Sequence, residues 1–418
     1  MSTKKEKGSF FEKNPKVTII AAIILVITAL DVTAANVYKA ISGYPFYSRA
    51  QKEAERMEKE AERIDKICRT GSSIYHHDFK KNISVKNAIW GNRRYSISTD
   101  SLGFRNRNVI DTPLKSNNYR IVFIGDSFTE GLGVEYQDTF VGIISNKLSQ
   151  EGIEVLNAAV CSYCPSLYWK KIKYLIEDVG LKFNELFVFI DMSDIGDEFF
   201  YYKSTNQDTA EDKEHKKNDK NEINKKSKKQ LIENVIRNNT LLVYFTLNKL
   251  RDFILPIDTV KQKQQHDNKY GINKQRSRWT IDDKLFQEYG KDGLDKTAFY
   301  MDLLFKLLRQ HEIKLTIAVY PWPDQIINND LNSIQVVFWK NWAKKRDVGF
   351  LNYFPCFIKV NRESDNILIL EKLFIQGDVH WNEAGHKLIA ENFLSFYMNN
   401  SKGNIEICVR DKYSAGHE

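Results

Sequence analysis

The chain has 418 residues, 42% of them hydrophobic, so it can bury one large core and carry an additional small module. Lysines and arginines number 62 against 54 acidic residues, and the excess lies in the amino-terminal tail and in one lysine- and asparagine-rich stretch. Because these basic residues are not interleaved with aromatic ones, the composition argues against a nucleic-acid partner. Five scattered cysteines exclude a disulfide-stapled scaffold, and the pair at 161 and 164 has no second pair to complete a zinc site. We therefore predict neither a metal nor another cofactor.

An apolar segment near the amino terminus predicts a membrane anchor. Residues 17–36 are mostly apolar or small, and the lysine-rich residues 1–16 before them are the predicted cytoplasmic tail. About 20 such residues span a bilayer, and flanking lysines mark the cytoplasmic side. The pattern predicts a single-pass helix in the cytoplasmic membrane, with the rest of the chain periplasmic or extracellular. A cleaved signal peptide is the alternative, because residues 33–35 are small; either interpretation exports the rest of the chain.

The next part, residues 37–115, is predicted to form a stalk and a lead-in segment. Residues 51–67 are charged, rich in helix-forming residue types, and carry opposite charges three or four positions apart. That spacing predicts a solvated helix.

Strand-like and helix-like segments then alternate in two parts of the chain, residues 116–207 and 296–400, before a short tail at 401–418. Short apolar strands separated by amphipathic helices predict a doubly wound, flavodoxin-like α/β domain with a parallel sheet. The expected strands are 120–124, 155–160, 186–191, 315–320 and 350–354, and the expected helices are 138–148, 167–179, 296–311, 333–345 and 383–398.

An insertion over residues 208–295 interrupts this alternation. Residues 208–229 contain almost no apolar side chain and are predicted to be mobile, whereas 230–250 have a helical pattern. The insertion is either a lid or partner surface or an excursion without a role, and the sequence leaves both open.

A serine lies where a nucleophile would be expected in such a domain. Residues 125–131 (GDSFTEG) follow the first strand directly, which places Ser127 at the carboxyl edge of the sheet, where α/β proteins bind ligands. A serine needs a base to take its proton. Near the other end of the chain, His380 precedes the last helix, and Asp378 stands two residues before it. We predict that the three form a Ser-His-Asp triad.

These two motifs also carry a family resemblance. Residues 125–131 and 378–386 (DVHWNEAGH) resemble the first and fifth sequence blocks of the SGNH (GDSL-type) hydrolase superfamily. The lead-in residues 98–105 and the phrase 320–325 (YPWPDQ) are similar to those of its bacterial cell-envelope members, which also place the Asp two residues before the His. The resemblance covers about residues 95–399 without the lysine-rich insertion. It implies an acyl-serine intermediate.

The resemblance also implies an oxyanion hole with two departures from the family pattern. The donors would be the N-H of Ser127, the N-H of Ser162 where the family has glycine, and the hydroxyl of Ser193 where the family has asparagine. Losing one donor costs about 2.7 to 4 kcal/mol. Ser193 and the following Asp194 are alternatively only the cap of a strand end.

Candidate substrate contacts surround these motifs. The candidates are Asp126, Asp194, Asp324, Gln325, Trp322 and Trp381. Trp322 and Trp381 could stack on a sugar ring or pack in the core.

Together these features predict a membrane-anchored esterase or O-acetyltransferase acting on an envelope polysaccharide or glycan, with a membrane acyltransferase as a candidate partner. The alternative is a catalytically weak or inactive glycan-binding or scaffold component of such a modification system, which the changes at Ser162 and Ser193 would allow.

Overall fold

The structure is a computed structural model that describes residues 14–200, 228–254, 266–272, 274–358, 363–399 and 405–406. The internal contacts divide the chain into two units. The smaller unit contains Met1–Lys59 and Asn206–Gln262, and the larger contains Glu60–Thr205 and Lys263–Glu418. The stretch 208–227, predicted to be mobile, lies outside the described residues.

The smaller unit is helical. It contains α2 (Pro15–Ser42), η1 (Phe46–Ser48), the first part of α3 (Arg49–Cys68), α9 (Lys228–Asn239) and α10 (Leu242–Ile254). Among the described residues, α2 is the one helix long and apolar enough to cross a membrane, and the charged helix expected over 51–67 is α3. The helical pattern expected over 230–250 corresponds to these two helices, α9 and α10, and between them the Thr240 hydroxyl accepts the N-H of Tyr244.

The larger unit is built on a mostly parallel sheet, as predicted. Its parallel strands lie in the order β10, β9, β8, β6, β7, which is the flavodoxin-like order 2-1-3-4-5 read from the other edge. The short strand β11 (Ile405–Glu406) pairs with the outer edge of β10. The parallel strands are β6 (Tyr119–Ile124), β7 (Ile153–Asn157), β8 (Glu185–Ile190), β9 (Lys314–Val319) and β10 (Gly349–Asn352).

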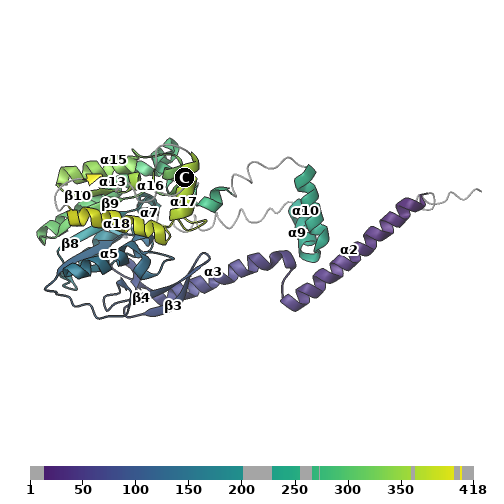
Figure 1. Ribbon diagram of the computed structural model, residues 1–418, viewed down its shortest axis with the longest axis horizontal. Helices are drawn as coiled ribbons and strands as arrows, with labels where there is room; N and C mark the ends of the chain where they lie inside the picture. The colour runs from purple at the N-terminus through teal and green to yellow at the C-terminus, as the bar shows by residue number, and fades with distance from the viewer. Residues whose placement is uncertain are drawn as a thin grey trace, which may run out of the picture. The chain divides into compact units, whose positions relative to one another are not determined.

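Helices cover both faces of this sheet (Figure 1). On one face, the ring of Phe123 in β6 packs on Phe140 of α5 and Phe393 of α18. On the other face, aromatic contacts join α6 to α13 and α13 to α15. The five helices confirm those expected from the sequence: α5 (Phe140–Leu148), α6 (Pro165–Glu177), α13 (Lys291–Gln310), α15 (Ile334–Arg346) and α18 (Glu383–Asn399).

Short helices connect these elements. They are α4 (Ser127–Glu130), η2 (Tyr136–Asp138), η3 (Ser149–Glu151), α7 (Asp194–Phe200), η5 (Arg278–Thr280), α12 (Asp283–Leu285), η6 (Phe286–Gly290), α14 (Pro323–Ile327), α16 (Phe354–Phe357) and α17 (Glu363–Leu373). Residues 274–295, expected in the insertion, pack within the larger unit: Trp279 is buried and its Nε1 donates to the Met192 carbonyl at 2.9 Å.

The lead-in segment is a β structure that the sequence pattern did not indicate. Strands β3 (Ser84–Trp90), β4 (Arg93–Thr99) and β5 (Arg105–Asn106) extend the sheet beyond β7 in antiparallel fashion. A separate hairpin contains β1 (Arg69–Ser72) and β2 (His76–Phe79). Strands β1, β2 and β5 have two to four residues, and β3 and β4, with seven each, mix apolar residues with polar and charged ones, so none is the apolar run by which the parallel strands were recognised.

Buried charges tie the lead-in to the core. Lys171 of α6 lies 2.7 Å from Asp78 of β2, and Arg69 lies 2.7 Å from Glu130, at the end of α4. Removing one partner of such a pair leaves an uncompensated buried charge, which typically costs about 3 to 5 kcal/mol. The lead-in is therefore part of the folded domain and not only a spacer.

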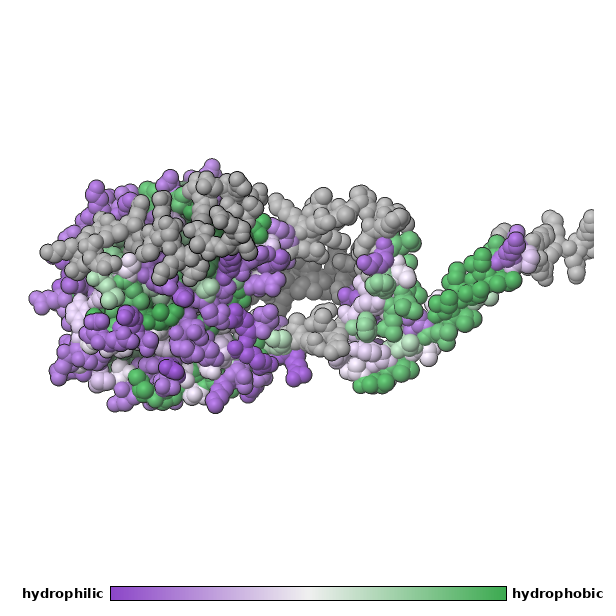
Figure 2. Space-filling model, in the orientation of Figure 1, coloured by the Kyte–Doolittle hydropathy of each residue, from purple (hydrophilic) through white to green (hydrophobic). Residues whose placement is uncertain are grey.

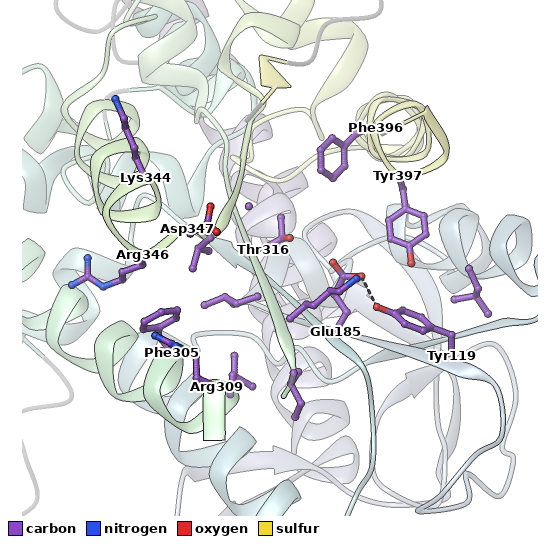
Figure 3. Close-up of a pocket in the computed structure, with 17 residues that line it drawn as sticks. Tyr119, Glu185, Phe305, Arg309, Thr316, Lys344, Arg346, Asp347, Phe396 and Tyr397 are labelled. Carbon is purple, nitrogen blue, oxygen red and sulfur yellow. Dashed lines mark hydrogen bonds between the residues drawn. The ribbon is translucent and has the colours of Figure 1, made fainter. Parts of the chain in front are cut away.

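A cavity of about 1160 Å³ lies at the amino ends of the parallel strands (Figure 3). Glu185 at the start of β8 lines it and accepts a hydrogen bond from the Tyr119 hydroxyl at 3.4 Å. Burial raises the pKa of Glu185 from 4.5 to about 7, and Lys314 and Tyr119 oppose the rise only in part. This edge of the sheet is opposite to the one at which β6 leads into Ser127.

The raised pKa predicts a pH-dependent stability. The folded state binds the Glu185 proton more tightly than the unfolded state, so this group's contribution to stability falls as the pH rises from about 4.5 to 7, by about 3 kcal/mol at most. We expect Glu185→Gln to raise the free energy of unfolding at pH 8 and to change it little at pH 4.5. Denaturation of the full chain in detergent at both pH values measures this, with the exposed Glu391→Gln as control. An equal effect of Glu185→Gln at both pH values would contradict the assignment.

Candidate active site

The end of β6 presents Ser127 at the carboxyl edge of the sheet. Ser127 is the first residue of α4, and the carboxylate of Asp126 caps this helix by accepting the N-H of Phe128 at 3.0 Å. Gly125 is required by space, because a Cβ there would meet the Thr129 hydroxyl at 2.3 Å. The turn from strand to helix is thus fixed by the residues on either side of the serine.

The structure brings the three residues of the predicted triad together. Ser127 Oγ lies 2.7 Å from His380 Nε2, and His380 Nδ1 lies 2.6 Å from Asp378 Oδ1. Ser127 is 8% exposed and His380 7%, so both are largely shielded from water. The three side chains form a continuous chain of hydrogen bonds across 253 residues of sequence.

The charge on Asp378 determines which nitrogen of His380 carries the proton. Burial raises the pKa of Asp378, but the hydrogen bonds and charge of His380 and the hydrogen bond from Trp90 outweigh it and bring the pKa to about 2. An ionised carboxylate only accepts, so Nδ1 of His380 must donate, which leaves Nε2 as the acceptor for the Ser127 hydroxyl. This tautomer is the one that a general base needs.

The loop that carries Asp378 and His380 is held from several sides. The N-H of Gly377 donates to the Lys269 carbonyl at 2.8 Å. Gly271 has φ of +65°, and a Cβ there would meet the Asp378 carbonyl oxygen at 2.4 Å, so only glycine fits. The ring of Phe128 lies 4.7 Å from that of His380 and anchors the imidazole on the nucleophile's side.

A second histidine nearby is unsuited to the role of base. Burial lowers the pKa of His386 to about 3, so its ring stays neutral. Its Nδ1 accepts the N-H of Phe140 at 3.2 Å, which joins α18 to α5. His386 therefore has a structural place in the helix packing.

The loop after β7 gives Ser162 a backbone conformation typical of glycine, the residue that the family pattern has at this position. Its φ is +63°, in the left-handed region where glycine is the usual residue. Glu130 positions this loop, because its carboxylate accepts the N-H of Cys161 at 2.6 Å and is held by Arg69. The same carboxylate thus joins the serine loop to the Ser162 loop.

Ser193 is engaged within its own loop. Its hydroxyl donates to Asp191 Oδ2 at 2.5 Å, and its N-H donates to the same oxygen at 2.9 Å. To serve as an oxyanion donor, the hydroxyl would have to leave this carboxylate. The arrangement matches the strand-end cap that the sequence left open as the alternative.

Three buried carboxylates lie behind the serine. Oxygens of Asp126, Asp191 and Asp194 lie within 4.8 Å of one another, a spacing that could hold a metal ion. However, Tyr320 and Trp322 donate to Asp126 and Asp191. Burial, and then the charge of Asp191, raise the pKa of Asp126 and of Asp194 well above the usual value. Two of the three carboxylates are thus already engaged by hydrogen-bond donors of the protein.

The candidate substrate contacts are buried and bonded to the protein itself. Asp324 accepts from the Lys274 N-H and the Ser277 hydroxyl, and Gln325 donates to the Ser277 carbonyl. Trp322 donates to Asp191 at 2.6 Å. Trp381 is 0% exposed and stacks on Phe357, so its ring belongs to the core and is not open to a sugar. All six candidates are buried, so none of them is open to a substrate in this structure.

Sequence reasoning missed the side chains of the lead-in that reach the site. Trp90 Nε1 donates to Asp378 Oδ2 at 2.6 Å, and its ring meets the His380 ring edge-on at 5.4 Å. The Arg105 guanidinium donates to the carbonyls of Glu130 and Gly131. A tryptophan before a glycine turn, or one arginine among many, gives no signal of these contacts.

The Trp90 contact predicts an effect on reactivity. Trp90→Phe keeps an aromatic ring but removes the donor to Asp378, and a hydrogen bond to a charged group is worth about 1.5 to 3 kcal/mol. We expect the pKa of Asp378 to rise and the reaction rate of Ser127 with a fluorophosphonate probe to fall about tenfold or more. The control is Trp169→Phe, whose ring packs on Tyr300. Equal rates for the two variants would show that Trp90 does not position the triad.

Comparisons with known proteins find structural likenesses but no related sequence. No protein-family model and no curated protein matches the chain. Solved structures that it resembles include a putative lipolytic protein of the G-D-S-L family from Desulfitobacterium hafniense DCB-2 (13% identity, 66% of this chain and 97% of that chain, TM-score 0.36). Others are the psychrotrophic esterase EstA from Pseudoalteromonas sp. (10%, 68% and 100%, 0.34) and Axe2, an acetylxylan esterase from Geobacillus stearothermophilus (13%, 67% and 94%, 0.35). Each of these matches covers about two thirds of this chain.

Proposed function

We propose that this protein is a membrane-anchored serine esterase or O-acetyltransferase that acts on ester groups of an envelope polysaccharide or glycan. The observation that carries the proposal is the hydrogen-bonded chain from Asp378 through His380 to Ser127, at the carboxyl edge of a doubly wound sheet. In that arrangement, an ordinary serine becomes a nucleophile at neutral pH.

The reaction would proceed in two halves. Ser127 Oγ attacks the ester carbonyl as its proton moves to His380 Nε2, and Asp378 stabilises the resulting imidazolium. The bond to the alcohol breaks, the alcohol takes the proton from Nε2, and the acyl group stays on Oγ. A water or a sugar hydroxyl then gives its proton to Nε2 and attacks the acyl carbon, and Oγ leaves with that proton.

Backbone donors would stabilise the oxyanion in both halves. Ser127 is at the first turn of α4, where N-H groups have no acceptor within the helix, and Ser162 would offer its N-H from the neighbouring loop. Ser193 would contribute a third donor if its hydroxyl turned from Asp191. We propose this set as the oxyanion hole.

The anchor favours a substrate that belongs to the envelope. We propose that residues 1–16 are cytoplasmic, that residues 17–36 cross the cytoplasmic membrane, and that the domain formed by 116–207 and 296–400 is periplasmic or extracellular. A membrane acyltransferase that delivers acetyl groups to Ser127 is a candidate partner. Hydrolysis and transfer use the same residues and differ in whether a sugar hydroxyl reaches the acyl-serine before water.

A catalytically weak scaffold or glycan-binding component is the second candidate. The observation that favours it is the Ser193 hydroxyl held at 2.5 Å from Asp191, which leaves the site without the side-chain donor expected there. Such a protein would keep the fold and the Ser127–His380 pair but would react slowly.

Probe labelling separates the two candidates. We expect a fluorophosphonate to label the full chain and Ser149→Ala, whose serine is exposed on the surface, but not Ser127→Ala. Hydrolysis of an activated acetate ester should fall at least about 10³-fold in Ser127→Ala. If the wild-type protein is folded and remains unlabelled, the scaffold is the better description.

The substrate is tested in cells. We expect mass spectrometry of envelope glycans to show a change in acetyl mass between cells with the wild-type protein and cells with Ser127→Ala. A loss of acetyl groups in the variant indicates transfer, and a gain indicates hydrolysis. Glycans that are identical in both strains would exclude an envelope ester as the substrate.

A further inference from the structure

The smaller unit contains a charged residue in an unusual place. Asp31 lies within the apolar helix α2, about 21 Å along its axis from Val17, which follows the last lysine of the tail. A hydrocarbon core is about 30 Å thick, so Asp31 falls in the outer half of the proposed span. An ionisable residue at that depth is costly and normally has a specific partner.

The structure identifies that partner as the beginning of α10. Asp31 Oδ1 accepts the N-H groups of Leu241 and Leu242 at 2.9 and 2.8 Å, and Oδ2 accepts that of Val243 at 2.9 Å. These are the donors that a helix leaves unpaired at its start, and they favour a negative charge. The tip of the hairpin formed by α9 and α10 is therefore fastened to the proposed anchor at the level of the outer leaflet.

Aromatic side chains add to this attachment. The ring of Tyr47, which follows α2, lies 4.6 Å from the ring of Tyr244 in α10, and its hydroxyl donates to the Leu241 carbonyl. Tyrosines are common at the membrane-water boundary, because one end of the ring is apolar and the other polar. The start of α10 is thus joined to Asp31 of α2 and to Tyr47 of η1, which follows α2.

The rest of the hairpin exposes apolar side chains. Figure 2 shows hydrophobic residues on the surface of α9 and α10 as well as along α2. Six of these residues are 47 to 61% exposed, which a helix pair in water would avoid. They are Ile232, Val235, Leu242, Phe245, Leu247 and Leu250.

We infer that α9 and α10 form a membrane-binding hairpin whose apolar side chains enter the outer leaflet beside α2, with Asp31 as the residue that docks it. The inference rests on the proposed anchor. The sequence has four lysines, at 225, 226, 228 and 229, around the start of α9, and such a run suits a surface of anionic headgroups. The insertion would then hold the chain at the bilayer by a second contact.

Photocrosslinking in the full chain tests this directly. The photoreactive residue p-benzoylphenylalanine replaces Leu25, Phe245 or Phe299 one at a time. The protein is placed in vesicles of phosphatidylethanolamine and phosphatidylglycerol, and adducts are identified by mass spectrometry. Phe299 is the matched control, a phenylalanine 58% exposed in the larger unit, against 51% for Phe245. We expect lipid adducts at positions 25 and 245, at least about tenfold above position 299.

The three positions separate failure of the inference from failure of the anchor. Lipid adducts at 25 but not at 245, or adducts at 245 to a second copy of the chain, would overturn the hairpin and leave the anchor intact. The absence of lipid adducts at 25 would refute the anchor itself.

A substitution of Asp31 tests the docking. Asp31→Leu removes all three acceptor contacts and should abolish most of the lipid adduct at 245 while sparing that at 25. Asp31→Asn keeps a carbonyl oxygen in place of Oδ1 and should retain more of the lipid adduct at position 245 than Asp31→Leu does. If Asp31→Leu leaves the adduct at 245 unchanged, Asp31 does not dock the hairpin.

Discussion

The hydrogen bond between Ser127 and His380 depends on how the sheet brings together two segments that are 253 residues apart in the sequence. Ser127 begins α4, directly after the central strand β6, and His380 lies in the loop before the last helix of the domain. That helix, α18, returns to the same strand because Phe393 packs on Phe123. The packing of aromatic rings between α18, α5 and the sheet thus helps to set the distance between Ser127 and His380. A small change in that distance would lower the reactivity of the serine strongly.

Buried charge, and not only apolar packing, keeps the serine loop in register. Glu130 accepts from Arg69 and from the Cys161 N-H, so one carboxylate joins the lead-in hairpin, the serine loop and the next loop. Trp90, in another strand of the lead-in, donates a hydrogen bond to Asp378 and so joins the lead-in to the loop that carries His380. Such groups are stable when buried only if all partners are present, which makes the lead-in a condition for the geometry of the site.

In each of the two units, an aspartate carboxylate caps the beginning of a helix. In the larger unit, Asp126 caps the helix that begins with Ser127; in the smaller unit, Asp31 caps the beginning of α10. Each carboxylate satisfies helix N-H groups that would otherwise lack partners. One cap shapes the candidate active site, and the other, we propose, fixes a hairpin at the membrane. The reaction and the position of the protein would thus rely on the same kind of contact.

The sequence by itself determined the alternation of the parallel strands and their helices along the chain, the apolar helix and the two motifs around Ser127 and His380, because periodicity and motif spacing are local properties. Only the tertiary structure decided that Trp90 supports Asp378, that the Ser193 hydroxyl turns to Asp191, and that helices α9 and α10 of the insertion are joined to Asp31. The contact of Ser193 with Asp191 is local and is the strand-end cap that the sequence left open, whereas the contacts of Trp90 and Asp31 join ordinary residue types from distant segments. No local pattern encodes such pairings, so the fold must form before they exist.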